Sequence, residues 1–365
     1  MTAQQNADVA VVMHDRRGGG AERVTLTLAG AMADAGKTVD LVLFDRGGQY
    51  PIPEGVRPVF LDAPQVRRGV STLAKFLRST PPRALLSAMT HVNIATLLAV
   101  RLAGFRGRVV VVEHNTMSRK KEAAHRFAAR TAYALAPLAY RNADVIAGVG
   151  DGVAADLEKV LHPRPGQVRA LYNPVLDEAV VRRADEPVDD DWFAPGAPPV
   201  ALGVGRLHAQ KDFPTLIEAF ARVLAKREAR LLILGEGEER AALEAQIAKL
   251  GLAEHVRLPG FVGNPYAYYR RCGVFVLSSR MEGLPTVLIE AMACGAPIVS
   301  TDCESGPHEI LGGGKYGALV GVGDVAALED AIEAALADPR RCGPEATARY
   351  SVVTATQRYI EALGV

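Results

Sequence analysis

Residues 9–44, VAVVMHDRRGGGAERVTLTLAGAMADAGKTVDLVLF, decide the fold class of this chain. The apolar run at 9–13 predicts a buried strand, and the glycine-rich stretch 14–20 follows it as a turn. A helical pattern covers 21–35, and the apolar run at 39–44 predicts the next strand. Strand, helix and strand within about 36 residues form the βαβ unit of a parallel sheet.

The same alternation continues along the chain in two series. The first adds candidate strands at 84–88, 109–112 and 144–149, and a charged, proline-rich stretch ends it. The second has strands at 200–204, 230–234, 256–258, 274–277 and 297–300, with helices at 215–226, 238–250 and 285–294. The prediction is an α/β protein with two Rossmann-like, doubly wound domains facing a cleft. The domains are 1–175 and 200–365, with a linker at 176–199. The sequence leaves open whether the last helix, 350–363, packs on the C-terminal domain or returns to the N-terminal one.

Composition excludes several classes of protein. The chain has 365 residues, 49% of them hydrophobic, which suits two domains with substantial cores. A formal net charge of +1 argues against a nucleic-acid partner. The four cysteines form no CxxC pair, so we expect reduced, unligated thiols. The polar start and the lack of an apolar run of about 20 residues argue against a secreted or integral membrane protein, so we expect a cytoplasmic one.

The segment Gly205-Arg-Leu-His-Ala-Gln-Lys-Asp212 follows the strand at 200–204 directly. In an open α/β sheet, ligands bind beyond the carboxyl ends of the strands, so this loop lies where a ligand would. Arg206 offers a planar fork of donors and Lys211 a compact charge, and together they suit a diphosphate. Two solvated surface cations are the alternative.

A second segment, Ser279-Arg-Met-Glu-Gly-Leu-Pro-Thr-Val-Leu-Ile-Glu290, follows the strand at 274–277. Pro285 suits the first turn of the next helix, whose N-terminal N–H groups would face the cleft and favour phosphate. Glu282 precedes that helix and Glu290 lies inside it, so the two would contact different parts of one ligand, such as ribose and hexose hydroxyls. The spacing of two glutamates is weak evidence by itself.

A third segment, Gly18-Gly-Gly-Ala-Glu-Arg23, occupies the first strand-to-helix turn. Glycines there let the backbone approach a phosphate or a sugar closely. The pattern is not the G-x-G-x-x-G dinucleotide fingerprint, and a turn that merely connects two elements is the alternative.

Taken together, these segments resemble the retaining glycosyltransferases of family 4, which have the GT-B fold. The resemblance rests on residues 19–23, residues 205–211, and the two glutamates separated by seven residues, with the continuation Ala291-Met-Ala-Cys-Gly-Ala-Pro-Ile-Val-Ser-Thr301. It spans nearly the whole chain and is strongest at 200–311. Asp212 departs from the glycine that many members carry there. The stretch 301–311 resembles bacterial members that build cell-surface polysaccharides on lipid carriers.

The resemblance implies a role for each matching residue. Arg206 and Lys211 would bind the donor diphosphate and neutralise the leaving group, Glu290 would bind the ribose, and Glu282 the transferred sugar. His114, after the strand at 109–112, resembles the family's cleft histidine near the donor sugar; a structural histidine is the alternative. Further residues would line the donor: Gly283, Leu284 and Pro285 at the sugar and phosphate, Pro259 and Gly260 at the base, and Gly19 and Gly20 from the opposite domain.

The resemblance also implies the reaction. The N-terminal domain would bind the acceptor and the C-terminal domain the nucleotide sugar. A hexose or N-acetylhexosamine would move, with retention, from a UDP sugar to a lipid-linked or saccharide acceptor in polysaccharide or glycan biosynthesis, without a metal or another cofactor. We interpret the acidic run 189–191 as a solvated part of the linker. The alternatives are a GDP-sugar transferase, a nucleotide-sugar epimerase or a phosphorylase of similar architecture, and a non-enzymatic nucleotide-sugar sensor.

Residues 67–130 are strongly basic, with thirteen Lys and Arg side chains against two acidic ones. Ser118-Arg-Lys-Lys-Glu-Ala-Ala-His-Arg-Phe-Ala-Ala-Arg130 concentrates this charge beside apolar residues. Such a face suits an anionic membrane surface or a lipid-diphosphate acceptor, which would make the enzyme peripheral on the inner face of the plasma membrane. A merely solvated helix is the alternative.

Overall fold

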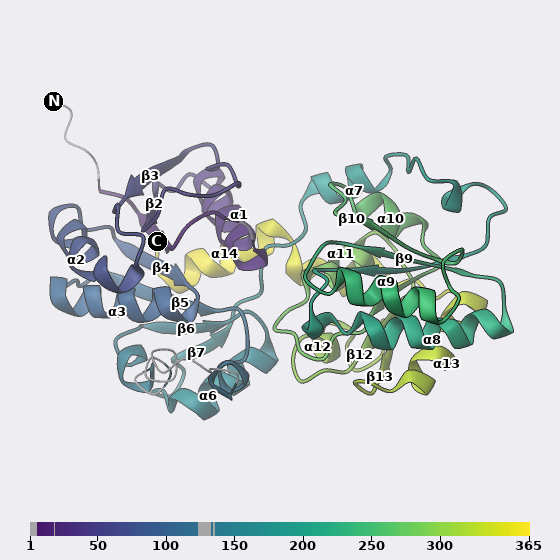
Figure 1. The fold of residues 1–365 in the computed structure, drawn as a ribbon. Coiled ribbons are helices and arrows are strands. Elements are labelled where there is room, and N and C mark those ends of the chain that lie inside the picture. The colour runs from purple at the N-terminus through teal and green to yellow at the C-terminus, as the bar shows by residue number, and fades with distance from the viewer. Residues whose placement is uncertain (1–5, 18, 123–132, 134–135) are drawn as a thin grey trace. The chain divides into compact units, whose positions relative to one another are not determined.

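The structure is a computed structural model that describes residues 6–17, 19–122, 133 and 136–365. The chain divides into two compact units (Figure 1). The first comprises Met1–Pro174 with Tyr350–Val365, and the second comprises Val175–Arg349. Each unit has one sheet of parallel strands with helices packed on it, so the predicted α/β fold class with two Rossmann-like domains is confirmed.

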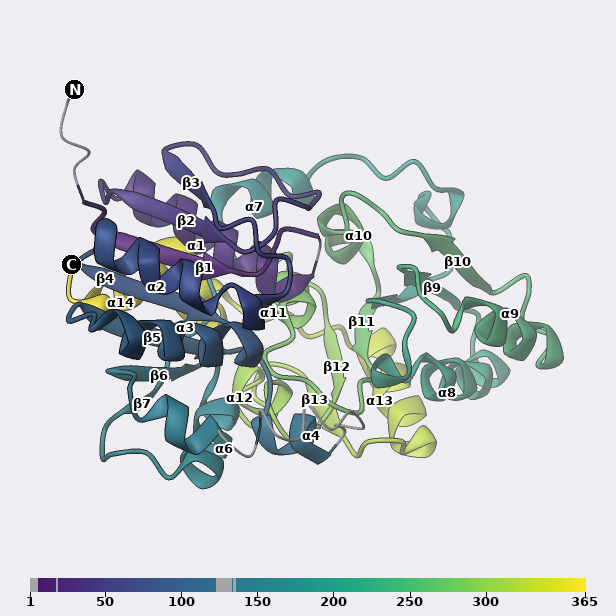
Figure 2. The ribbon, with the colours of Figure 1, turned by 60° about the vertical axis from the view of Figure 1, so that its left-hand side comes forward.

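The first unit contains a seven-stranded sheet. Its strands are β1 (Val9–Met13), β2 (Val39–Leu43), β3 (Val56–Phe60), β4 (Ala84–Ala88), β5 (Arg108–Glu113), β6 (Val145–Gly148) and β7 (Val168–Ala170). They are ordered β3-β2-β1-β4-β5-β6-β7. The helices described in this unit are α1 (Gly20–Asp34), α2 (Val70–Ser79), α3 (Thr90–Ala103), α4 (Met117–Glu122), α6 (Asp151–Leu161) and α14 (Val352–Leu363). Helices α2 and α3 lie side by side (Figure 2). Strands β1, β2 and β4 are buried throughout, as expected where helices cover both faces of a parallel sheet.

The second unit contains a six-stranded sheet. Its strands are β8 (Val200–Val204), β9 (Arg230–Leu234), β10 (Val256–Gly260), β11 (Val274–Leu277), β12 (Ile298–Thr301) and β13 (Ala318–Val320), in the order β10-β9-β8-β11-β12-β13. Its helices are α7 (Glu178–Ala184), α8 (Phe213–Lys226), α9 (Arg240–Lys249), α10 (Tyr266–Arg271), α11 (Thr286–Ala293), α12 (Pro307–Ile310) and α13 (Val325–Ala337). Helices α8 and α13 pack together on the apolar core, in which Phe213 and Phe220 are fully buried.

Both sheets reverse their strand order at the first strand of the unit. In the first unit β1 lies between β2 and β4, and in the second β8 lies between β9 and β11. The connections therefore leave this strand in opposite directions, which opens a crevice at the carboxyl ends of the strands. Such a switch point is where an α/β sheet binds its ligand.

The segment predicted as a linker, 176–199, is a folded part of the second unit. Helix α7 begins at an Asp177 cap, whose carboxylate accepts the Val180 N–H at 3.0 Å, and α7 packs on α10. Trp192, later in the same segment, is buried at 3% exposure. The Arg257 guanidinium stacks on its indole ring, 4.2 Å from the ring centre. The linker interpretation weighed the charges and prolines of this stretch and overlooked its buried apolar side chains.

The last helix, α14, belongs to the first unit, where it contacts α1, β4 and β5. Arg108 Nε donates to the Ala362 carbonyl at 2.6 Å, and the Tyr359 hydroxyl donates to the Leu171 carbonyl at 3.1 Å. The chain therefore returns to its first unit after completing the second. Within the described part of the chain, no helix combines the length and the apolar character that crossing a bilayer requires.

Candidate active site

The loop after β8 brings Arg206 and Lys211 to the carboxyl edge of the second sheet, at its switch point. The neighbouring strand holds this loop, because the Gly205 N–H donates to the Leu234 carbonyl at 3.0 Å. Gly235, with φ +144°, permits the approach: a Cβ there would lie 1.9 Å from the Gly205 oxygen. The side chain of Arg206 is exposed and forms no hydrogen bond or ion pair with any described residue.

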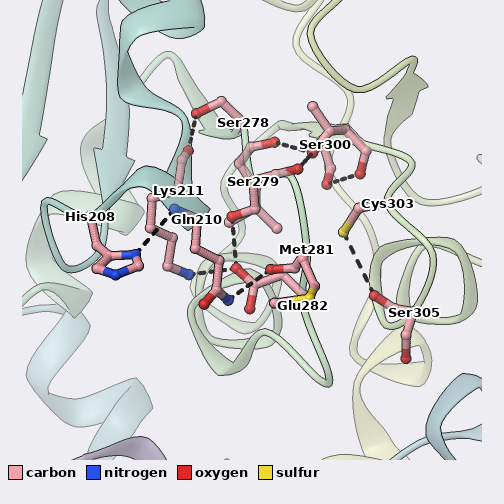
Figure 3. A network of polar contacts seen from close by, with 12 residues as sticks. His208, Gln210, Lys211, Ser278, Ser279, Met281, Glu282, Ser300, Cys303 and Ser305 are labelled. Carbon is pink, nitrogen blue, oxygen red and sulfur yellow. Dashed lines mark hydrogen bonds and ion pairs between the residues drawn. The ribbon is translucent and has the colours of Figure 1, made fainter. Parts of the chain in front are cut away.

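A close ion pair joins this loop to the loop after β11, as Figure 3 shows. Lys211 Nζ lies 2.6 Å from Glu282 Oε1, and the two side chains are only 16% and 9% exposed. Two further hydrogen bonds tie the loops together: Gln210 Nε2 donates to the Met281 carbonyl at 2.7 Å, and the Arg280 N–H donates to the Gln210 carbonyl at 2.8 Å. The cation predicted for the diphosphate and the acid predicted for the sugar are therefore direct partners.

Asp212 closes the same loop in a left-handed conformation, with φ +50°. Glycine adopts this conformation freely and aspartate tolerates it, which explains how either residue can stand here. The carboxylate is 1% exposed, and Oδ1 accepts a hydrogen bond from Arg280 at 2.9 Å. This contact raises the pKa of the Arg280 guanidinium. The pair is a further clamp between the two loops.

Side-chain hydroxyls support the loop after β11 from several directions. Ser278 Oγ donates to the Lys211 carbonyl at 2.8 Å, and Ser279 Oγ donates to Glu282 Oε1 at 2.7 Å. Thr301, at the end of β12, donates to the Ser279 carbonyl at 2.6 Å. Ser305 Oγ donates to the Gly283 carbonyl at 3.0 Å. We did not predict any of these residues; small hydroxyl residues that directly follow apolar strands were the available signal.

Helix α11 begins after Pro285 and points its N-terminal end to the same loop, which contains Gly283 and Leu284. The N–H groups and dipole of a helix start favour an anion. Glu290 lies inside α11 and is 3% exposed. The pKa of the Tyr269 phenol is raised well above its ordinary value by burial and by the nearby Glu290 carboxylate. Glu290 thus lies on the core side of the site.

Pro259 and Gly260 end β10, two strands away from the switch point. The Gly235 N–H donates to the Gly260 carbonyl at 2.8 Å, which links the end of β10 to the end of β9. All nine predicted site residues of the second unit therefore belong to β10, to α11, or to the loops after β8 and β11.

The first unit contains the other three predicted residues. Gly19 is the N-cap of α1 in an extended conformation, and Gly20 begins the helix with no heavy atom within 4 Å of the position a Cβ would take. His114 is half-buried and follows β5 directly. In this sheet β4 alone separates β1 from β5, so the glycine turn and His114 lie at one carboxyl edge.

A buried carboxylate precedes His114. Glu113 is fully buried, and its oxygens accept hydrogen bonds from Thr90 Oγ1 at 2.8 Å, from Asn93 Nδ2 at 2.9 Å, and from the Tyr140 hydroxyl. Burial, and then the Glu113 charge, raise the pKa of the Tyr140 phenol well above its ordinary value. This network fixes the end of β5 to the start of α3, and sequence reasoning did not find it.

The acidic run 189–191, which the sequence suggested is merely solvated, instead contributes two ion pairs. Asp190 and Asp191 are paired with Arg257 at 3.3 and 2.9 Å. No group of three His, Cys, Asp or Glu side chains among the described residues has the arrangement of a metal site. The second unit instead offers an exposed arginine, a lysine–glutamate pair and a helix N-terminus at one sheet edge. These groups suit a ligand with a phosphate and several hydroxyls.

Comparison with protein families gives two adjacent matches. Residues 18–178 match the model described as Glycosyltransferase Family 4, and residues 186–350 match Glycosyl transferases group 1. The chain is 30% identical over 346 residues to the N-acetylgalactosamine-N,N'-diacetylbacillosaminyl-diphospho-undecaprenol 4-alpha-N-acetylgalactosaminyltransferase of Campylobacter jejuni, with 91% of each chain covered. It is 28% identical to the amylovoran biosynthesis glycosyltransferase AmsD of Erwinia amylovora, with 80% of each covered.

Solved structures share the fold. The structure of Anabaena HepE in complex with UDP and glucose superposes with a TM-score of 0.80 at 20% identity, covering 98% of this chain and 99% of that one. The apo form of the lipopolysaccharide outer core galactosyltransferase WaaB superposes with a TM-score of 0.76 at 20% identity, with coverage of 98% and 99%.

Proposed function

The chain belongs to glycosyltransferase family 4, and on that premise we propose that it moves a hexose or N-acetylhexosamine from a UDP sugar to a lipid-linked or saccharide acceptor. The name of the Campylobacter relative describes transfer to a sugar on diphospho-undecaprenol, and the AmsD relative is named for polysaccharide biosynthesis. These names support an acceptor of the same class here, in the synthesis of a bacterial polysaccharide or glycan.

The observation that carries the proposal is the Lys211–Glu282 pair, which joins the loop that contains Arg206 to the loop that leads into α11. Two cations and a helix start stabilise the negative charge that develops on a departing diphosphate. Carboxylates accept hydrogen bonds from sugar hydroxyls, which suits Glu282 for the transferred sugar and Glu290 for the ribose. One site can thus hold both ends of a nucleotide sugar.

The proposed transfer retains the configuration at the anomeric carbon. The acceptor oxygen forms its bond to this carbon on the face from which the diphosphate leaves, as the carbon–phosphate oxygen bond breaks. The acceptor proton passes to the departing phosphate oxygen. Catalysis then consists mostly of positioning and of electrostatic stabilisation of the leaving group.

Substitution of the two cations tests the assignment. Arg206→Ala and Lys211→Ala should each lower kcat about 10²-fold, as expected when a donor to a developing charge is removed. Lys226→Ala is a matched control. Lys226 also forms an ion pair with a poorly exposed glutamate, Glu329, at 2.6 Å, but this pair joins α8 to α13 and is not part of the candidate site. Near-wild-type turnover in both test variants would refute the proposal.

The nucleotide preference is tested by binding. A thermal-shift screen with UDP, GDP and their hexose and N-acetylhexosamine conjugates should give its largest stabilisation with a UDP compound, because a ligand that binds only the folded state raises the melting temperature. A larger shift with GDP compounds would assign the enzyme to GDP sugars instead.

We propose that the reaction needs no metal. The pairing of Asp190 and Asp191 with Arg257 supports this, and so do the two cations and the helix start, which provide the charge that a metal would otherwise supply. Turnover should be unchanged in excess EDTA, and a loss of activity that Mg²⁺ or Mn²⁺ restores would contradict the proposal.

We further propose a cytoplasmic enzyme that binds the inner face of the plasma membrane through residues 67–130. Leu98 and Leu102 on α3 are 47% and 56% exposed, and the basic side chain of Arg101 lies between them in sequence. Residues 123–130 of the basic segment lie outside the described residues. Sedimentation with phosphatidylglycerol vesicles at low and high salt tests this, with phosphatidylcholine vesicles as the control. Absence of salt-sensitive binding to the anionic vesicles refutes it.

A further inference from the structure

Two adjacent serines at the carboxyl end of β11 hold the two members of the Lys211–Glu282 pair. Ser278 Oγ donates to the backbone carbonyl of Lys211, and Ser279 Oγ donates to the side chain of Glu282 (Figure 3). Ser278 and Ser279 are 1% and 0% exposed. Because buried hydroxyls are restricted to the partners around them, these contacts limit the freedom of both charged residues.

The contacts on Glu282 are unevenly divided between its two carboxylate oxygens. Oε1 accepts from Lys211 Nζ at 2.6 Å and from Ser279 Oγ at 2.7 Å. Oε2 accepts no hydrogen bond from any described residue. An ionised carboxylate has about four acceptor sites, so Oε2 keeps its capacity for a ligand hydroxyl. The network satisfies one oxygen and leaves the other available.

The position of Ser279 is itself fixed from the next strand. Thr301 Oγ1, at the end of β12, donates to the Ser279 carbonyl at 2.6 Å, and Thr301 is 1% exposed. A chain of hydrogen bonds therefore runs from β12 through Ser279 to Glu282, and the Lys211 ammonium completes it from the loop after β8. Such connected networks favour a single arrangement of the side chain that ends them.

We propose that Ser279 is a positioning residue that orients Glu282 so that Oε2 accepts a hydroxyl of the donor sugar. The inference rests on the proposed function and deepens it, because it assigns recognition of the sugar, as distinct from the nucleotide, to the Ser279–Glu282 contact. The nucleotide part of the donor depends on Arg206, Lys211 and Glu290, and the Ser279 hydroxyl donates to Glu282 and to none of these three. Loss of the serine hydroxyl should therefore affect the hexose and leave the nucleotide unaffected.

The test compares calorimetric affinities for UDP and for UDP-glucose, UDP-galactose, UDP-N-acetylglucosamine and UDP-N-acetylgalactosamine. In the wild type, the preferred sugar should add to the affinity of UDP. Ser279→Ala should reduce that added affinity about five- to tenfold, which is within the range of one typical lost hydrogen bond, and change UDP affinity less than twofold. Thr347→Val is the control, since the Thr347 hydroxyl is also buried in the second unit but donates to the Pro344 carbonyl at 3.3 Å, outside this network. Unfolding midpoints of all variants show whether each is folded.

A double-mutant cycle separates positioning from a general structural effect. If Ser279 acts through Glu282, Ser279→Ala should have no further effect on sugar affinity in a Glu282→Ala background. Equal losses in both backgrounds, equal losses of UDP and UDP-sugar affinity, or no loss at all would each overturn the proposal. A wild-type protein that binds no UDP or GDP sugar and transfers none would instead refute the proposed function.

Discussion

Replacing Arg280 should destabilise the second unit far more than replacing its partner, Asp212. The Asp212 side chain is 1% exposed, whereas that of Arg280 is 62% exposed. Arg280→Ala leaves a buried carboxylate without its cation, and removing one partner of a fully buried pair costs about 3–5 kcal/mol. Asp212 precedes α8, whose N-terminal dipole favours a carboxylate by about 1 kcal/mol. The helix dipole and the exposure of the Arg280 side of the pair both reduce the penalty below that of a fully buried pair. We therefore expect Arg280→Ala to cost about 2 kcal/mol.

The opposite substitution returns Arg280 to water. Loss of an ion pair with an exposed partner costs about 0–1 kcal/mol, and glycine removes the strain of a left-handed residue, about 1 kcal/mol. Asp212→Gly should therefore change the free energy of unfolding by less than about 1 kcal/mol. Asp212→Ala loses the pair and keeps the strain, so it should fall between the other two variants. The Arg280→Ala, Asp212→Gly double variant should recover most of the loss caused by Arg280→Ala.

Urea unfolding followed by tryptophan fluorescence measures this series. The chain has one tryptophan, and Trp192 is buried in the second unit, so the signal reports on the unit that contains the pair. With a slope of about 2 kcal/mol per M urea, Arg280→Ala should lower the midpoint by about 1 M. Arg270→Ala, which removes an exposed pair with Asp185, controls for loss of a surface arginine. If Asp212→Gly lowers the midpoint as much as Arg280→Ala, the reasoning from burial is wrong.

Three further predictions follow from buried groups. Glu113→Ala should destabilise the first unit by about 3 kcal/mol, because the buried Thr90 and Tyr140 hydroxyls lose their acceptor, and Asn93 keeps only its bonds to Val112 and Tyr140. Glu113→Gln keeps one acceptor and should cost about half as much; urea unfolding followed by far-UV circular dichroism compares the two variants. Gly306→Ala should weaken donor binding measured by calorimetry, because φ is +89° there and the new Cβ would lie 2.7 Å from the oxygen of Gly283, a predicted donor-binding residue. Gly323 has a similar φ of +74° but open space around the Cβ position, so Gly323→Ala should leave donor binding unchanged. Burial raises the pKa of three thiols, those of Cys272, Cys294 and Cys303, from 9.0 to about 12. Each of these thiols therefore loses its proton at a lower pH in the unfolded state than in the folded state. The free energy of unfolding should fall between pH 9 and 12 by about 1.4 kcal/mol per pH unit per thiol, and equal urea midpoints at pH 8 and pH 10 would contradict this.

The sequence alone determined the fold class and most of the strands. Strands β1, β4, β8 and β11 were predicted with their observed bounds, since a strand covered on both faces is a continuous apolar run that ends where burial ends. Strands β3, β7 and β13 were not predicted. Each is a short, partly exposed strand at an edge of its sheet, so it lacks the continuous apolar run that marks the buried strands.

For the candidate site, the sequence determined which residue types follow which strands, and so placed the cations, the glutamates and the helix start at carboxyl ends. Only the tertiary structure decided their partners. Lys211 and Glu282 are 71 positions apart in sequence, and they meet because β8 and β11 are neighbours in the sheet. That neighbour relation arises from the crossover at the switch point, which local patterns do not encode. The same holds for the Thr301–Ser279 and Arg280–Asp212 hydrogen bonds, which join residues that follow different strands.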